Sequence, residues 1–201
     1  MQSPDWYKPP QTAPNAEIRY AASASAEYAG FGIRAGARII DTIVGVVLAF
    51  IAGAIVGIGA LAVSGVHAAS HKGSFFPTML VSSLGKLAYH AVTESTGGAT
   101  VGKAILGLRV RSESLGPCRF GAAVGRSLLF YVDAFFFGLV AHNAMSKSLT
   151  QQRVGDRAAG TVVVYARSLP PETTGSVAGG IVMGTVLWMV CLVGSAILKM
   201  L

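Results

Sequence analysis

Two long uncharged runs most constrain how this chain folds. Residues 42–66 form a run of twenty-five without a charge, and residues 177–198 form another of twenty-two. At about 1.5 Å per residue, a helix of either length crosses a hydrocarbon core of about 30 Å. The composition agrees with a lipid solvent, since 52% of the residues are hydrophobic, 12% are charged and the mean hydropathy is +0.57. We therefore expect two transmembrane helices in these runs.

Two further apolar segments are less regular. Residues 75–92 are apolar in their first half and then admit Lys86 and His90, and we expect a span here. Residues 127–141 are apolar but short, and they contain Asp133. The predicted fold is an all-helical transmembrane bundle with three full spans plus a short re-entrant or interfacial helical element at 127–141. Four spans are the alternative.

The distribution of Lys and Arg favours three spans. Four basic residues occur up to Arg38, one in residues 67–74, five in 95–126 and four in 143–175. Basic residues near spans mark the cytoplasmic side, and a crossing at 127–141 would put the last group outside. The net charge of +7 is explained by attraction to anionic lipid, so the expected partner is the bilayer and we expect no nucleic acid.

A glycine-rich stretch from 97 to 110, GGATVGKAILGLRV, suggests a phosphate-binding loop. Such a loop needs a buried strand before it and a Ser or Thr after the lysine to hold magnesium. Lys103 is instead followed by Ala104, and an apolar segment precedes Gly97. We therefore expect no nucleotide hydrolysis here, no enzyme activity and no cofactor. His67 and His71 lack a third ligand nearby, so we expect no metal site either.

Three motifs together resemble the RDD family of bacterial membrane proteins, which is named for one arginine and two aspartates. The first is YAGFGIRAGARIID at 28–41, which contains Arg34 and Asp41. The second is GGATVGKAILGLRV, and the third is QRVGDRAAGTVVV at 152–164, which contains Asp156. In the second motif, Thr100, Gly102 and Lys103 match the family's Gly-x-Thr-x-Gly-Lys segment.

The resemblance implies a multi-pass protein of the bacterial inner membrane, in a family suggested to take part in transport of ions or other ligands. It covers about residues 28–165. We expect residues 1–27 to be a flexible proline-rich tail, residues 166–176 to be a linker and residues 177–201 to be a C-terminal transmembrane helix.

Charged residues share one face at the start of the first span. Arg34, Arg38 and Asp41 lie at positions i, i+4 and i+7 of a helix, so both guanidinium groups can approach one carboxylate. A pairing of Arg34 with Asp41 would fix the helix register, whereas an ion or proton site at Asp41 would have the same spacing. Both interpretations stay open.

The same face of the helix then continues with small residues at every fourth position, Gly45, Ala49, Gly53 and Gly57. Small residues at this spacing allow another helix to approach closely, so we expect helix packing here.

Further polar groups suggest a track. Lys86, His90 and Glu94 also share one helix face and would form a polar track with Asp41 or Asp133. The alternative is that this span ends early, with Lys86 reaching the interface and Glu94 in water. In the three-span topology, Asp156 lies on the same side as Arg34 and Arg38 and would complete a salt-bridged cluster.

These features support two functional hypotheses. In the first, the protein moves a small ion or proton through the Arg and Asp site, with Asp41 as the carrying group. In the second, it is a non-transporting adaptor or regulator that assembles with another membrane protein. In either case the glycine face predicts a homo-oligomer or a complex with another membrane protein.

Overall fold

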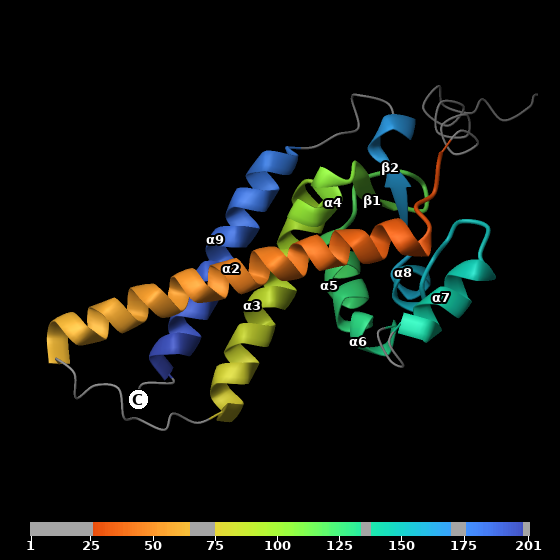
Figure 1. Cartoon of the computed structure of the whole chain (residues 1–201). Coiled ribbons are helices and arrows are strands. Elements are labelled where there is room, and N and C mark those ends of the chain that lie inside the picture. Colours follow the sequence, from red (N-terminus) through yellow and green to blue (C-terminus); the bar gives the residue numbers. More distant parts are fainter. Residues whose placement is uncertain (1–25, 65–74, 134–137, 170–175, 199–201) are drawn as a thin grey trace, which may run out of the picture.

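Three long helices have one end at a small domain built from short helices and two strands (Figure 1). The computed structural model describes residues 26–64, 75–133, 138–169 and 176–198, and the expected tail up to residue 25 and the residues of 65–74, which include His67 and His71, lie outside them. The described elements are α2 (Phe31–Ser64), α3 (Phe75–Thr96), α4 (Val101–Ile105), β1 (Leu108–Ser112), α5 (Phe120–Leu128), α6 (Phe130–Asp133), α7 (Leu139–Ser146), α8 (Val154–Ala158), β2 (Thr161–Tyr165), η3 (Ala166–Ser168) and α9 (Val177–Leu198).

Two of the described helices are long and apolar enough to cross a membrane, Phe31–Ala62 within α2 and Val177–Leu198. The first contains residues 42–62 of the uncharged run at 42–66, and the second coincides with the run at 177–198. The third expected span, α3, has 22 residues but is less apolar than these two helices. Three full spans are therefore not confirmed. The second half of α3 is instead buried by protein, at Tyr89, His90 and Glu94 among others.

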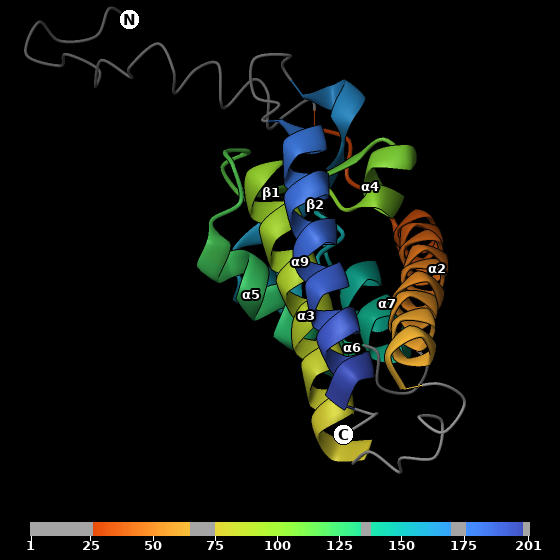
Figure 2. The ribbon, with the colours of Figure 1, turned by 90° about the vertical axis from the view of Figure 1, so that its left-hand side faces the viewer.

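Close contact between α3 and α9 depends on glycines. A Cβ on Gly85 would lie 2.5 Å from Cys191 Cβ, and a Cβ on Gly184 would lie 2.6 Å from Thr93 Cγ2. The two helices therefore pack side by side along much of their length (Figure 2).

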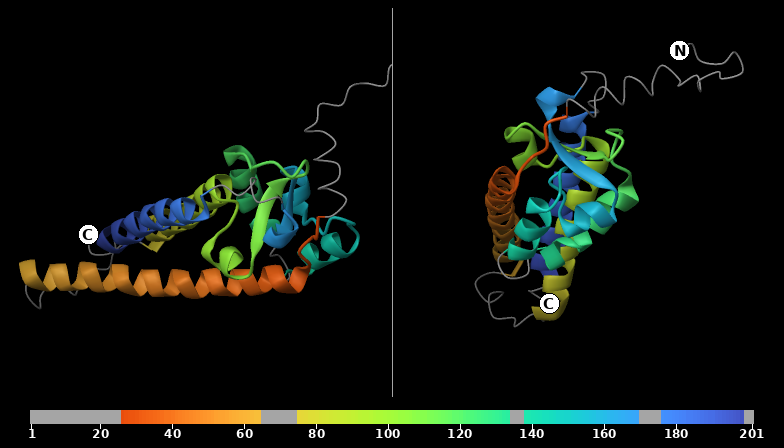
Figure 3. Two further views of the ribbon diagram at one scale, coloured as in Figure 1. Left: turned by 90° about the horizontal axis from the view of Figure 1, so that it is seen from above. Right: turned by 90° about the vertical axis from the view of Figure 1, so that its right-hand side faces the viewer.

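Trp188 of α9 joins these two helices to α2. Its side chain is buried, its ring centroid lies 4.9 Å from that of Tyr89, and a Cβ on Gly45 would lie 2.5 Å from its Cη2. α2 lies to one side of the pair formed by α3 and α9 (Figure 3), and Ala52, seven residues after Gly45, is still buried. Of the predicted glycine face, Gly45 therefore packs within the chain, whereas Ala49 is exposed and a Cβ added to Gly53 or Gly57 would have open space around it.

The prediction of an all-helical fold is wrong at one place, because β1 and β2 form a two-stranded antiparallel sheet. Leu108 pairs with Tyr165 and Ser112 with Thr161. The sequence TVVVY of β2 is rich in β-branched residues, which favour strands, and its four leading residues are buried. Val110 and Val163 pack with Ala29 and Ala123 into the core of the small domain.

The apolar block at 127–141 contains no helix of spanning length in its described residues. It comprises the end of α5, the four-residue α6 and the start of α7, which lie near α8 at the N-terminal end of α2. The expected tail ends at Glu27, which forms an ion pair with Arg167. The expected linker begins with residues 166–168, which form a 3-10 turn.

Helix packing at Gly184 leads to a stability prediction. We expect Gly184→Leu to force α3 and α9 apart and to lower the free energy of unfolding by about 1–3 kcal/mol or more, as overpacking does. Thermal unfolding in detergent measures the change. Gly194→Leu is the matched control, because Gly194 is in the same helix and has open space around it. Equal melting temperatures for the two variants would contradict this packing.

Candidate functional site

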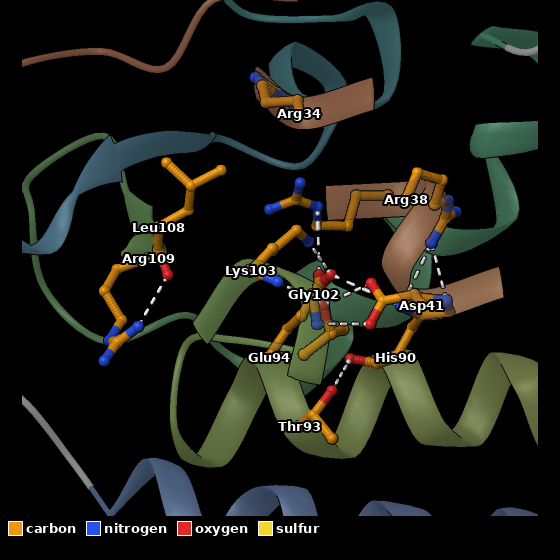
Figure 4. Close-up of polar contacts among 12 residues, drawn as sticks. Arg34, Arg38, Asp41, His90, Thr93, Glu94, Gly102, Lys103, Leu108 and Arg109 are labelled. Atoms are coloured by element: carbon orange, nitrogen blue, oxygen red, sulfur yellow. Dashed lines mark hydrogen bonds and ion pairs between the residues drawn. The ribbon is translucent and has the colours of Figure 1, made fainter. Parts of the chain in front are cut away.

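Charged residues from six helices meet beside the first turns of α2, and we call them the charged cluster. α2 contributes Arg34, Arg38 and Asp41, and α3 contributes His90 and Glu94 (Figure 4). The other members are Lys103 of α4, Arg126 of α5, Asp133 of α6, and Arg153 and Asp156 at the start of α8. Most of these side chains are buried, so their charges must be satisfied by one another.

Asp41 is held by uncharged donors. The hydroxyl of Thr100 donates to its Oδ2 at 2.7 Å, the backbone N–H of Gly102 donates to its Oδ1 at 2.8 Å, and Tyr89 Oη lies 3.4 Å from Oδ1. Among the described residues no ion pair joins Asp41 to an arginine. The predicted pairing of Arg34 with Asp41 is therefore wrong.

The Gly-x-Thr-x-Gly-Lys motif forms the receptor for Asp41. Thr100 is the N-cap of α4, and its hydroxyl also accepts a hydrogen bond from the Lys103 N–H. A Cβ on Gly102 would collide with the backbone carbonyl of Ala37, so only glycine lets α4 lie this close to α2. The loop thus binds an anion, as its resemblance to a phosphate loop suggests, and that anion is a carboxylate of the same chain.

Asp156 is the most highly paired carboxylate. Arg34 donates to its Oδ2, and Arg126 Nη2 and Arg153 Nη2 lie 2.9 and 3.3 Å from its Oδ1. Burial alone would raise the pKa of Asp156, but Arg126, Arg153 and Arg34 outweigh that effect and hold it well below its usual value. The structure thus brings Arg34 together with Asp156 in a salt-bridged cluster.

Glu94 is the second buried acid, with 3% of its surface exposed. It accepts a hydrogen bond from Lys103 Nζ, and Arg126 Nε lies 3.4 Å from its Oε2. The alternative that placed Glu94 in water is wrong, because its side chain is buried among Lys103 and Arg126. Burial lowers the pKa of Lys103 to about 8, although Glu94 opposes the shift.

Arg38 differs from the other basic residues of the charged cluster. Its Nη1 donates to His90 Nε2 at 2.7 Å, and its guanidinium lies 3.7 Å from the centroid of the Phe130 ring. In the part of the chain that the structure describes, no carboxylate lies within 4.0 Å of it. Arg38 thus carries a positive charge with no direct counter-charge.

The predicted polar track is only partly assembled. His90 contacts Arg38 and lies 3.9 Å from Glu94, whereas Lys86, one turn earlier, is half-buried and outside the ion pairs found among the described residues. Asp133 faces a different element, since it accepts hydrogen bonds from the N–H groups of Val154 and Gly155 at the start of α8. Burial raises its pKa.

A cavity of about 490 Å³ opens beside these residues. The basic residues that line it are Arg34, Arg38, Lys103, Arg126 and Arg153, and the acidic ones are Asp41, Glu94 and Asp133. Asp156 does not line the cavity but pairs with Arg34, Arg126 and Arg153, so five basic residues face four carboxylates and the charged cluster keeps one excess positive charge. On charge alone, the cavity suits an anion better than a cation.

This fold and charged cluster define a membrane-associated helical protein whose buried ion pairs lie at one end of its long helices. The chain belongs to the RDD family, whose model matches residues 28–160. The family expected from the three motifs is therefore confirmed. No curated protein and no solved structure matches the chain.

Sequence reasoning did not identify Arg126 and Arg153 as members of the site, nor Tyr89. Arg126 lies in a helix with an apolar face, and it is 1% exposed because that face is turned into the small domain. Arg153 and Asp156 are three residues apart, and this spacing at a helix start was the available signal.

The depressed pKa of Lys103 leads to a pH prediction. An unfolded lysine keeps its proton to about pH 10.5, whereas folded Lys103 loses it near pH 8. The unfolded state therefore binds more protons between these values, and this residue makes the protein more stable as the pH rises through that interval. The melting temperature of wild type minus that of Lys103→Met should therefore increase from pH 7 to pH 10.

Exposed Lys147 provides the matched control for that measurement. We expect the difference between wild type and Lys147→Met to stay constant over the same pH range. A constant difference for Lys103→Met as well would show that Lys103 titrates normally.

Proposed function

We propose that this RDD protein binds a small anion in the cavity beside Arg38 and handles that ion at the cytoplasmic face of the bacterial inner membrane. The observation that carries the proposal is the guanidinium of Arg38, which lines the cavity and has no carboxylate within 4.0 Å among the described residues. A guanidinium held against an aromatic ring and a histidine nitrogen has a restricted orientation, which suits recognition of an oxyanion by its remaining N–H groups.

The surrounding residues support an anion over a cation or proton. Both oxygens of Asp41 already accept hydrogen bonds from the chain, so this carboxylate is poorly placed to take up a passing cation. Asp156 and Glu94 are likewise occupied by basic groups. In this proposal these acids hold the basic residues in position, and Arg38 contacts the ion.

Ion movement across the bilayer is the activity that we propose for this site. The basic residues of the N-terminal and central segments support the cytoplasmic placement that we propose for the site. The described part of α2 carries no charge after Asp41, so all its charged residues lie at its N-terminal end. We therefore propose that the anion enters and leaves the site at this end of the helix.

Substitution of Arg38 tests this function. We expect Arg38→Gln to weaken binding of inorganic phosphate or sulfate about tenfold or more in calorimetry, because a charge-assisted hydrogen bond is lost. Flux of the same anion from proteoliposomes should fall in parallel. Arg119→Gln removes the same charge at an exposed position and should leave both unchanged. Absence of binding, or equal binding by both variants, would refute the proposal.

A second candidate function is that of an adaptor for another membrane protein, and one observation favours it. The second half of α2 extends beyond the other helices, with Gly53 and Gly57 uncovered and Ala49 exposed on the same face (Figure 1). Small residues on a membrane helix allow a partner helix to approach closely. A second copy of this chain or another membrane protein would fill this face.

Crosslinking tests the adaptor function. A photoreactive side chain at position 49 should give a crosslinked product of defined mass in native membranes, and Gly53→Leu together with Gly57→Leu should remove it. Gly59→Leu is the control, because Gly59 lies more than about 100° around the helix from both glycines. A product of twice the chain mass would indicate a homo-oligomer. A product unaffected by the double substitution would contradict a role for this face.

A further inference from the structure

We infer that the anion taken by this cavity is a phosphate group borne by an anionic membrane lipid, with the lipid's chain lying along α2. This inference rests on the proposed function and names the class of its ligand. It follows from the two different walls of the cavity and from its position on α2.

One wall is built to hold a phosphate group. Besides Arg38, the buried Arg126 lines the cavity, is 1% exposed and has an Nη1 with no hydrogen-bond partner among the described residues. That Nη1 atom has almost no accessible surface, so Arg126 acts on a phosphate group in the cavity through its charge. Lys103 and Arg153 add positive charge to the same wall.

The adjacent wall is apolar. Phe31, Ala35, Ile39 and Ile43 line the cavity at every fourth position of α2, beside the ridge that carries Arg34 and Arg38. Ile39 is 62% exposed and Ile43 is 58% exposed. A free oxyanion gains nothing from an apolar wall, whereas an acyl chain is stabilised by leaving water along it.

The apolar wall continues beyond the cavity into the uncharged part of α2. Val46, Val47 and Phe50 follow Ile43 at helical spacing, and each is at least half exposed. The cavity therefore lies where the charged start of this helix meets its lipid-facing part. A lipid headgroup occupies this same level of a bilayer, between water and hydrocarbon.

The size of the cavity agrees with this ligand. Its volume of about 490 Å³ is many times the volume of about 30 Å³ occupied by one water molecule, so a single oxyanion leaves most of it unfilled. A glycerol phosphate headgroup with the first carbons of its chains fills more of this space and contacts both walls.

Calorimetry on the full chain in detergent tests the inference with four probes. These are dioctanoyl phosphatidylglycerol, dioctanoyl phosphatidylcholine, glycerol 3-phosphate and inorganic phosphate. We expect phosphatidylglycerol to bind about tenfold or more tighter than the two water-soluble phosphates, because burial of a few methylene groups contributes that much. It should also bind more tightly than zwitterionic phosphatidylcholine.

Two variants separate the apolar wall from the anion site. Ile39→Ser should weaken phosphatidylglycerol binding several-fold and leave the affinity for inorganic phosphate unchanged. Ile55→Ser, at an exposed position of α2 outside the cavity, is the matched control and should bind the lipid as wild type does.

The outcomes distinguish this inference from the proposed function. If the soluble phosphates bind as tightly as phosphatidylglycerol, the lipid is not the ligand and the anion site stands. The same holds if Ile39→Ser and Ile55→Ser weaken phosphatidylglycerol binding equally. If phosphatidylcholine binds as tightly as phosphatidylglycerol, the phosphate charge is not recognised and the inference is overturned. If no phosphate-bearing probe binds and Arg38→Gln changes nothing, both proposals fail.

Discussion

The structure of the charged cluster depends on Arg126, which bridges its two buried acids. Arg126 Nε lies 3.4 Å from Glu94 Oε2 on α3, and Arg126 Nη2 lies 2.9 Å from Asp156 Oδ1 on α8. Asp156 in turn accepts a hydrogen bond from Arg34 of α2, so one arginine connects the ends of three helices. Buried ions are costly unless each is paired, and removal of one member leaves the others without a counter-charge. The small domain is thus held against the long helices by groups that are stable only together.

Asp41 has the complementary role, because it is satisfied without an arginine. The hydroxyl of the N-cap Thr100 and the backbone N–H of Gly102 donate to its carboxylate, and this arrangement ties α4 to α2. The arginine that spacing assigned to Asp41 as a partner is therefore used elsewhere, and Arg38 is left with an aromatic ring and a neutral histidine nitrogen. The surplus positive charge that lines the cavity follows from this exchange of partners.

The sequence predicted the shared helix face of Arg34, Arg38 and Asp41 correctly, because helical spacing determines which side chains lie on one side. It did not predict the partner of each, since the partner is chosen among several elements that approach the same point. The strands β1 and β2 were missed for a similar reason. Each has five residues, and they pair across about fifty residues of chain, so neither shows a long pattern of alternation. Glu94 was considered as a group in water because its neighbours in sequence do not reveal that α5 covers it.

By itself, the sequence determined that two long helices of this chain are suited to lipid, and its three motifs identified the family. Both follow from properties carried by local residues, which are apolar run length and the order of short patterns. Only the tertiary structure decided which acid each arginine meets, that the glycine-rich loop binds Asp41, and that Arg38 faces a cavity. These depend on free energies of burial and pairing between segments far apart in the chain, and local spacing contains no information about them.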